Sequence, residues 1–154
     1  MDSDQFQAAL ETGIRLLARR EHAGLELRLK LRQRDYSDDV IDAVIADLTA
    51  RGYLSEERFA EIFVRHKVES GWGPARIAAE MRKRGIDDTV FRRYFDSMDV
   101  DWLKQAREVR QRRFGSGRPR DRRDWARQGR FLAGRGFSAE QIARVLDDPG
   151  EESI

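Results

Sequence analysis

The chain has no cysteine, three prolines and two histidines among its 154 residues. The absence of cysteine excludes disulfides and thiolate metal sites, and it fits a reducing compartment. No apolar run approaches the roughly 20 residues that a membrane-spanning helix needs, and the N-terminus lacks a secretory pattern. We therefore expect a cytoplasmic protein without a membrane span and without a cofactor.

Catalytic motifs are also missing from the sequence. It contains no P-loop, no dinucleotide-binding glycine run and no metal-binding His-Glu spacing. His22 and His66 have no nucleophile at a plausible spacing, so we interpret both as surface or interface residues. The carboxylate pairs Asp38-Asp39 and Glu56-Glu57 stand at predicted helix starts, where the helix dipole accounts for them. We expect no enzymatic activity, and we interpret Gly71-Trp72-Gly73-Pro74 as a turn with an exposed aromatic side chain.

The residues that are abundant favour helices. Hydrophobic residues make up 40% of the chain and charged residues 38%, and the apolar positions recur at intervals of three and four. This pattern predicts an all-α protein. We predict helices near residues 4–20, 24–34, 38–51, 56–69, 74–84, 88–96, 101–114, 122–134 and 139–147.

A short module recurs three times, about 50 residues apart, as Arg34-Asp35-Tyr36-Ser37, Arg84-Gly85-Ile86-Asp87 and Arg135-Gly136-Phe137-Ser138. Each copy predicts a corner between two helices. The second residue takes the left-handed conformation that ends a helix, and the fourth caps the next helix. Glycine adopts that conformation without steric cost, so the first copy, with aspartate, is the weakest. Self-similarity at a fixed period predicts a protein built from stacked repeats.

The corners divide the chain into three tandem three-helix repeats. A further corner at Gly52-Tyr53-Leu54-Ser55 joins the first repeat to the second. We predict repeats at residues 1–52, 53–97 and 98–147 and a frayed tail at 148–154. Because about 50 residues bury only a small core, neighbouring repeats must stabilise one another.

Charge is segregated along the chain. Between Tyr36 and Glu61 seven acidic residues face two basic ones, whereas between Lys104 and Arg135 twelve basic residues face three acidic ones. Eleven of those twelve are arginines, which suit bidentate contacts to phosphate or carboxylate. The alternative is a set of solvated helix faces without a partner.

We propose that basic residues of the middle and last repeats contact DNA or an acidic protein surface. Arg107, Arg110 and Arg113 should share a helix face through their three-residue spacing. Phe114 beside them could stack on a base or have a core or hinge role, and residues 115–119 read as a flexible basic link. The candidate contacts are Lys67, Arg76, Lys83, Arg84, Arg107, Arg110, Arg112, Arg113, Arg118, Arg120, Arg122 and Arg123.

Several of these segments resemble the RecX family of RecA modulators. The resemblance is strongest at 52–60 (Gly-Tyr-Leu-Ser-Glu-Glu-Arg-Phe-Ala), at Gly71-Trp72-Gly73-Pro74 and at Arg84-Gly85-Ile86. It continues at Arg19-Arg20-Glu21-His22 and at 131–138, and it spans about residues 14–147. The sequence departs from the family pattern at Ala23, where the family usually has serine, which puts the cap of the second helix in doubt.

The resemblance implies an elongated, curved body of three-helix repeats with helix-turn-helix-like corners. It also implies a monomeric cytoplasmic regulator of homologous recombination and the SOS response. Such a protein would bind RecA and the RecA filament on single-stranded DNA. It would inhibit strand exchange, ATP hydrolysis and filament growth, and it could bind DNA directly.

Two other functions remain open from the residues alone. The first is a helical-repeat DNA-binding protein that acts independently of RecA. The last helix of each repeat is mostly acidic or apolar, however, and so offers few base-reading side chains. The second is a scaffold for an acidic protein unrelated to recombination.

Overall fold

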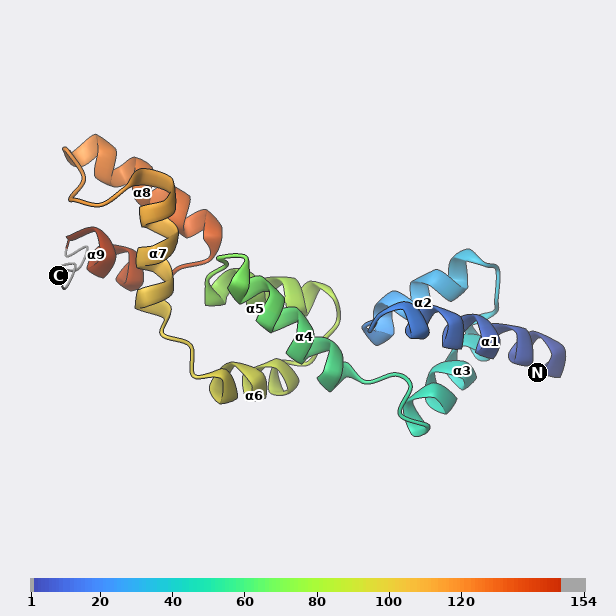
Figure 1. Cartoon of the computed structure of the whole chain (residues 1–154). Helices are drawn as coiled ribbons and strands as arrows, with labels where there is room; N and C mark the ends of the chain where they lie inside the picture. The colour runs from blue at the N-terminus through green and yellow to red at the C-terminus, as the bar shows by residue number, and fades with distance from the viewer. Residues whose placement is uncertain (1, 148–154) are drawn as a thin grey trace. The chain divides into compact units, whose positions relative to one another are not determined.

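The computed structural model describes residues 2–147, and every regular element in that range is an α-helix (Figure 1). This confirms the predicted all-α class, and the helix ends agree with the predicted ranges to within two residues. The tail predicted at 148–154 lies outside the described residues. In chain order the helices are α1 (Ser3–Arg19), α2 (Gly24–Gln33), α3 (Asp38–Ala50), α4 (Glu56–Glu69), α5 (Pro74–Lys83), α6 (Asp88–Met98), α7 (Trp102–Phe114), α8 (Arg122–Arg135) and α9 (Ala139–Asp147).

The helices form two compact units. The first comprises the residues up to 62 together with 81–91, and the second comprises 63–80 together with the residues from 92 onward. Helices α4, α5 and α6 contribute to both, so the middle repeat is shared between the units. No helix of the described range combines the length and the apolar character needed to cross a bilayer.

Helices α1, α2 and α3 enclose the core of the first unit. Leu31, Ile41 and Leu48 are fully buried there. Gly13 of α1 lets α3 approach closely, because a Cβ atom at that position would lie 2.8 Å from Leu48 Cδ1. Truncating one of these buried side chains to alanine would cost about 2–5 kcal/mol.

The core of the second unit lies among α7, α8 and α9. Its fully buried members include Ala106, Leu132 and Val145, with Trp102 and Trp125 packed against them. Helix α9 has apolar residues at helical spacing along one side, and this side closes the core.

The three predicted corners have the predicted geometry. The capping residue has φ of 66° at Asp35, 80° at Gly85 and 104° at Gly136. In each copy the next amide donates to the carbonyl five residues before it, as in a Schellman motif. These bonds are Tyr36 N to Leu31 O at 3.4 Å, Ile86 N to Met81 O at 3.0 Å and Phe137 N to Leu132 O at 3.2 Å.

Two expectations about single residues in these units were wrong. His22 is not a surface residue, since it is 1% exposed. Its Nδ1 lies 3.0 Å from the Arg20 carbonyl and its Nε2 lies 2.9 Å from Lys30 Nζ. Because the Lys30 ammonium can only donate, Nε2 accepts and the proton resides on Nδ1. Trp72 is half-buried rather than exposed, because cationic side chains cover its ring.

The first and middle repeats are joined in the first unit by a side chain. Ala23 precedes α2 and makes no side-chain cap. Instead Glu56, at the start of α4, accepts a hydrogen bond from Gly24 N at 2.8 Å. Arg58 adds a bond to Glu21 at 2.8 Å and a bond to the Gly52 carbonyl at 2.6 Å. The cap that the sequence put in doubt is therefore supplied by the next repeat.

The middle and last repeats are joined in the second unit by main chain. Gly73 N donates to Arg135 O at 2.6 Å, and Ala75 N donates to Gly136 O at 3.0 Å. The free amides at the start of α5 thus pair with the free carbonyls at the end of α8. The approach is so close that a Cβ atom on Gly73 would lie 2.5 Å from the Gly136 carbonyl.

Candidate arginine-rich interface

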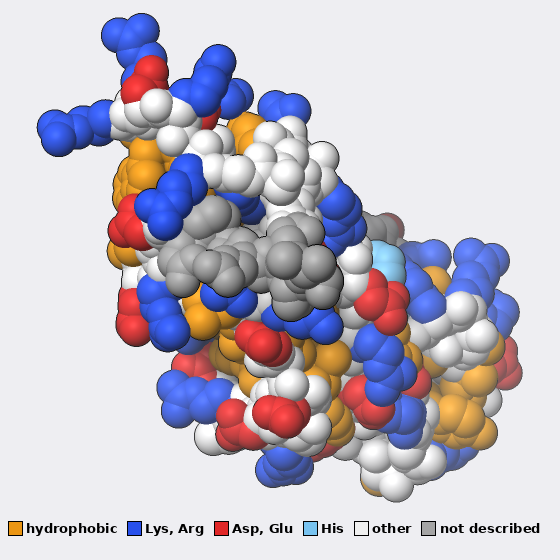
Figure 2. Space-filling model, turned by 60° about the vertical axis from the view of Figure 1, so that its left-hand side comes forward, with side chains coloured by type: hydrophobic (Ala, Val, Ile, Leu, Met, Phe, Trp, Pro, Cys, Tyr) orange, Lys and Arg blue, Asp and Glu red, His pale blue; other side chains and the backbone are white. Residues whose placement is uncertain are grey.

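The basic segment predicted from the sequence lies on α7, on α8 and on the loop between them. Figure 2, which brings the C-terminal part of the chain forward, shows Lys and Arg side chains projecting at its upper edge, with scattered acidic side chains among them. Nine of the twelve basic residues of this segment are exposed. Arg107 and Arg135 are half-buried, and Arg110 is buried.

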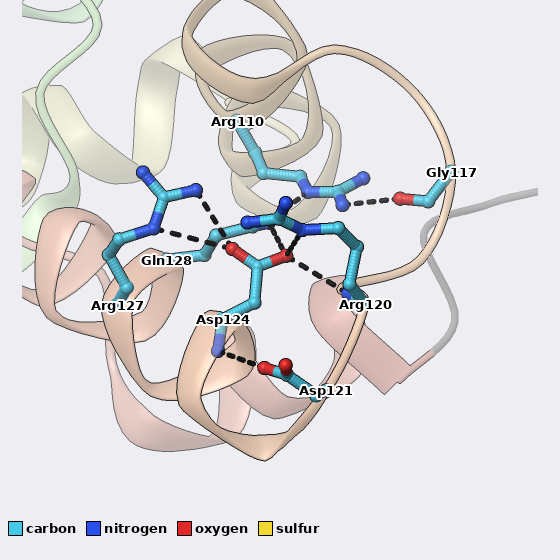
Figure 3. Close-up of polar contacts among 7 residues, drawn as sticks. All are labelled: Arg110, Gly117, Arg120, Asp121, Asp124, Arg127 and Gln128. Atoms are coloured by element: carbon cyan, nitrogen blue, oxygen red, sulfur yellow. Dashed lines mark hydrogen bonds and ion pairs between the residues drawn. The ribbon is translucent and has the colours of Figure 1, made fainter.

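Arg110 is not part of this exposed surface. It is 2% exposed, and its Nε donates to Gln128 Oε1 at 2.8 Å. Its terminal nitrogen donates to the carbonyl of Gly117 in the loop (Figure 3). Burial lowers the pKa of Arg110, and the nearby Asp124 carboxylate opposes that shift. The prediction that Arg110 contacts a partner from the same helix face as Arg107 and Arg113 is therefore wrong, because its side chain points into the protein.

A single buried carboxylate organises the start of α8. Asp124 is 6% exposed and accepts hydrogen bonds from Arg120 N at 3.0 Å and from Arg127 at 2.8 Å. Gln128 Nε2 donates to it at 3.1 Å, which links it to Arg110 (Figure 3). The hydrogen bonds from Arg120 and Arg127 lower the pKa of Asp124 to about 2. The carboxylate is therefore ionised at any physiological pH.

This network anchors the loop that the sequence presented as a flexible link. Arg110 holds the loop at Gly117, Asp124 holds it at Arg120, and Asp121 caps α8 through the Asp124 amide at 2.8 Å. The side chains of Arg118, Arg122 and Arg123 project from this anchored frame. Within residues 2–147 none of these three lies within ion-pair distance of a carboxylate.

Beside the loop, guanidinium groups and phenyl rings alternate along the surface of α7 and α8. The guanidinium carbon of Arg127 lies 4.9 Å from the Phe114 ring centroid. Arg113 lies 5.7 Å from both the Phe114 and the Phe131 centroids, and Arg135 lies 5.2 Å from that of Phe131. The two rings meet edge to face at 5.3 Å. We call these five residues the Arg–Phe ladder.

Of the ladder residues, Arg127 was expected only as one of the charges of the basic segment, Arg135 as the start of the third corner, and Phe131 as part of the family resemblance; none of the three was predicted to contact a partner. A signal for them exists, because Arg127, Phe131 and Arg135 follow one another at intervals of four along α8. Phe114 packs on Phe131 and Arg127, so it belongs to the ladder.

The four candidates of the middle repeat do not form one cluster. Lys67 and Arg76 belong to the second unit and both lie over the Trp72 ring, at 4.6 and 3.8 Å from its centroid. Lys83 and Arg84 belong to the first unit. Their contact with a partner stays a prediction.

Among residues 2–147, no three His, Cys, Asp or Glu side chains are grouped so as to hold a metal ion. The exposed arginines offer ionised guanidinium groups, which suit bidentate hydrogen bonds to anions such as phosphate or carboxylate.

Comparison with known proteins identifies a family for each part of the chain. The model for the first three-helix domain of RecX matches residues 9–48, that for the second matches 55–92 and that for the third matches 99–146. Regulatory protein RecX of Halorhodospira halophila (strain DSM 244 / SL1) is 49% identical over 148 residues, which cover 94% of this chain and 92% of the relative. The protein of the same name from Pseudomonas entomophila (strain L48) is 45% identical over 139 residues, 90% of each chain.

Solved structures show the same fold. The crystal structure of RecX from Lactobacillus salivarius superimposes with a TM-score of 0.80 at 20% identity, covering 95% of this chain and 97% of that one. A second crystal structure, of a regulatory protein RecX, gives a TM-score of 0.83 at 18% identity and covers 95% of this chain and 74% of that one.

Proposed function

The chain belongs to the RecX family of regulatory proteins, and we propose that it regulates RecA by binding the RecA filament on single-stranded DNA. Binding would inhibit strand exchange, ATP hydrolysis and filament growth, and so would modulate homologous recombination and the SOS response in the cytoplasm. The observation that carries this proposal is the 49% identity over nearly the whole chain to a named regulatory protein RecX.

Three joined domains suit a polymeric partner. Each domain can make a weak contact, and the covalent connection raises the effective concentration of the next contact along the same polymer. A protein that prefers one state of the filament shifts the filament toward that state, which is sufficient for inhibition without any catalysis.

The anchored loop supports an acidic partner surface. Arg118, Arg122 and Arg123 are exposed and unpaired among the described residues, so their charge is available to steer and orient the encounter. The Asp124 network fixes the loop backbone before binding. Less conformational entropy is then lost when the complex forms.

The test is RecA-catalysed strand exchange and DNA-dependent ATP hydrolysis with increasing amounts of the full chain. We expect inhibition by the unmodified chain. For the double variant Arg122→Glu/Arg123→Glu we expect a half-inhibitory concentration about tenfold higher, which corresponds to about 1.4 kcal/mol. Glutamate in the first turn of α8 is favoured by the helix dipole, so this variant should fold.

The matched control is Arg92→Glu/Arg93→Glu, which changes the charge equally at an adjacent exposed pair on α6. Its inhibition should stay close to that of the unmodified chain. The proposal fails if the unmodified chain leaves both RecA reactions unchanged. Equal binding to bare DNA and to the filament would instead support the helical-repeat DNA-binding protein that acts without RecA.

A further inference from the structure

The Arg–Phe ladder borders a hollow in the surface of the second unit. The hollow has a volume of about 210 Å³ and is lined by Ser70 and Gly71 after α4, by Val109, Arg112 and Arg113 of α7, and by Phe131 and Arg135 of α8. Three guanidinium groups and one aromatic ring thus meet around one small space. Gly71 keeps it open, since a Cβ atom there would lie 3.1 Å from Val109 Cγ2.

Within residues 2–147, no carboxylate pairs with the positive charge around the hollow. None of Arg112, Arg113 and Arg135 lies within ion-pair distance of a carboxylate in the described part of the chain. The one bond from Arg112 in this range goes to a main-chain carbonyl, Glu108 O, at 3.4 Å. Three uncompensated like charges at one place repel one another, and a bound anion would relieve that repulsion.

The rings hold the arginines in place. Arg113 lies over two rings and Arg135 over one, all within 5.7 Å of the ring centroids. Such stacking restricts the rotamers of a long side chain while the N–H edge of the guanidinium stays available. The cost of ordering the arginines is therefore met largely before a ligand arrives.

From this geometry we propose that the hollow and the ladder bind the phosphate groups of single-stranded DNA. A volume of about 210 Å³ is smaller than the ~300–1,000 Å³ of pockets for drug-sized ligands, so it suits one small anionic group. Beyond the hollow the ladder continues with Phe114 and with Arg127, whose guanidinium is already paired with Asp124, so the free charge of the row lies at Arg112, Arg113 and Arg135. A nucleic acid backbone carries a charge at every residue and can follow such a row, whereas an acidic side chain supplies one charge at one point.

Interleaved aromatic and basic side chains favour a single strand over a duplex. Unpaired bases can stack on aromatic side chains and on arginine guanidinium planes, and every base has a π-face. A duplex keeps its bases stacked inside and would use the guanidinium groups alone. The inference deepens the function proposed above, since it assigns the nucleic acid of the filament to named residues, but it requires no RecA.

The test measures binding of the full chain to fluorescently labelled oligothymidine by anisotropy, at salt concentrations from about 50 to 200 mM. For Arg113→Gln/Arg135→Gln we expect weaker binding. The slope of log K against log salt should also become shallower by about 0.7 for each phosphate group that the variant no longer binds. Arg144→Gln, an exposed arginine of α9 outside the ladder, is the control, and its affinity and slope should not change.

Phe131→Leu separates positioning from charge. It removes the ring and keeps an apolar side chain, so binding should weaken severalfold while the salt slope stays that of the unmodified chain. If the ring served folding alone, the melting temperature would fall and the affinity measured well below it would not. Circular dichroism on each variant verifies that it is folded.

Three results would overturn the inference. The double variant could bind bare DNA with the same affinity and salt slope as Arg144→Gln. It could also lose binding to the RecA filament alone, which would indicate that the hollow contacts an acidic protein surface. The chain could also bind duplex DNA more tightly than a single strand. If the chain inhibits RecA but does not bind bare DNA, the proposed function stands and the DNA site is wrong. If it binds DNA but does not inhibit RecA, the proposed function is wrong and the DNA site stands.

Discussion

The two units join neighbouring repeats by different chemistry. In the first unit an ionisable side chain, Glu56, caps a helix of the preceding repeat, whereas in the second unit Gly73 and Gly136 bring main chain against main chain. A joint made by a side chain tolerates changes in the size of neighbouring residues, but it depends on the protonation state of one residue, here Glu56. A main-chain joint is indifferent to pH and to most side chains, but it cannot accept one added methyl group.

The strongest way to break the second joint is Gly73→Ala. The new Cβ atom would lie 2.5 Å from the backbone of Gly136, which has no flexible end to move aside. We expect a loss of about 3 kcal/mol in the free energy of unfolding, measured by urea denaturation, as for an overpacked site. Gly134→Ala is the control, because nothing lies within 4 Å of its Cβ position. That variant should be stabilised by about 0.5–1 kcal/mol, and an equal response of the two glycines would contradict the main-chain joint.

The first joint should respond more weakly. Glu56→Ala removes the acceptor for Gly24 N and should cost about 1 kcal/mol, as expected for a lost helix cap. Burial raises the pKa of Glu56, against the bond from Gly24 N, so its ionised form carries a desolvation cost at neutral pH. Glu56→Gln keeps an acceptor without that charge and should be nearly as stable as the unmodified chain at pH 7. A glutamine variant as unstable as the alanine variant would show that the charge, and not the hydrogen bond, makes this joint.

A fall in pH should affect the stability of the two units differently. Burial lowers the pKa of His22, so the unfolded chain binds more protons and stability falls as pH drops below about 6.5. The pKa of Asp124 is lowered to about 2, so its contribution to the second unit is lost only between about pH 4 and 2. Between pH 7 and 5, the protection factors of the backbone amides, which correct for the slower intrinsic exchange at lower pH, should fall in the first unit and not in the second.

His22→Gln should abolish that pH response, and His66→Gln, at an exposed position, should preserve it. A fall of the protection factors in both units between pH 7 and 5 would mean that another group controls the acid response.

The smallest expected effect concerns the corners. Asp35 has φ of 66° where the other two copies have glycine. Asp35→Gly removes the strain of the left-handed conformation in the folded chain, which stabilises it, but it also raises the conformational entropy of the unfolded chain. We expect a net gain of about 0.5 kcal/mol in the free energy of unfolding, measured by chemical denaturation. Gly85→Asp is the reciprocal change, and it should destabilise the chain. An unchanged stability in both variants would mean that the cap residue is not limiting.

The sequence predicted the features that depend on neighbouring residues. Helix ends and corners follow from caps such as Ser37 and Gly136, whose hydrogen bonds close within a few residues. Leu31 and Leu132, whose carbonyls accept the corner hydrogen bonds, are fully buried. The family resemblance is confirmed by models that match all three domains.

The sequence did not reveal which polar residues turn inward. Arg110 is on an arginine-rich helix, and spacing alone cannot say which arginine meets Gln128 of the next helix. The cap of α2 comes from Glu56, far along the chain, and the burial of His22 depends on Lys30 of the neighbouring helix. These contacts arise from tertiary packing, so no local pattern encodes them.

Arg135 takes part in two structures at once. Its carbonyl accepts the bond from Gly73 that holds the middle repeat against the last, while its guanidinium lies over Phe131 at the rim of the hollow. A change at the α5–α8 junction would therefore reach the rim of the hollow through one residue. Conversely, a phosphate group bound at the proposed site would contact the residue whose carbonyl joins the middle repeat to the last, so ligand binding and the stability of that joint would be coupled.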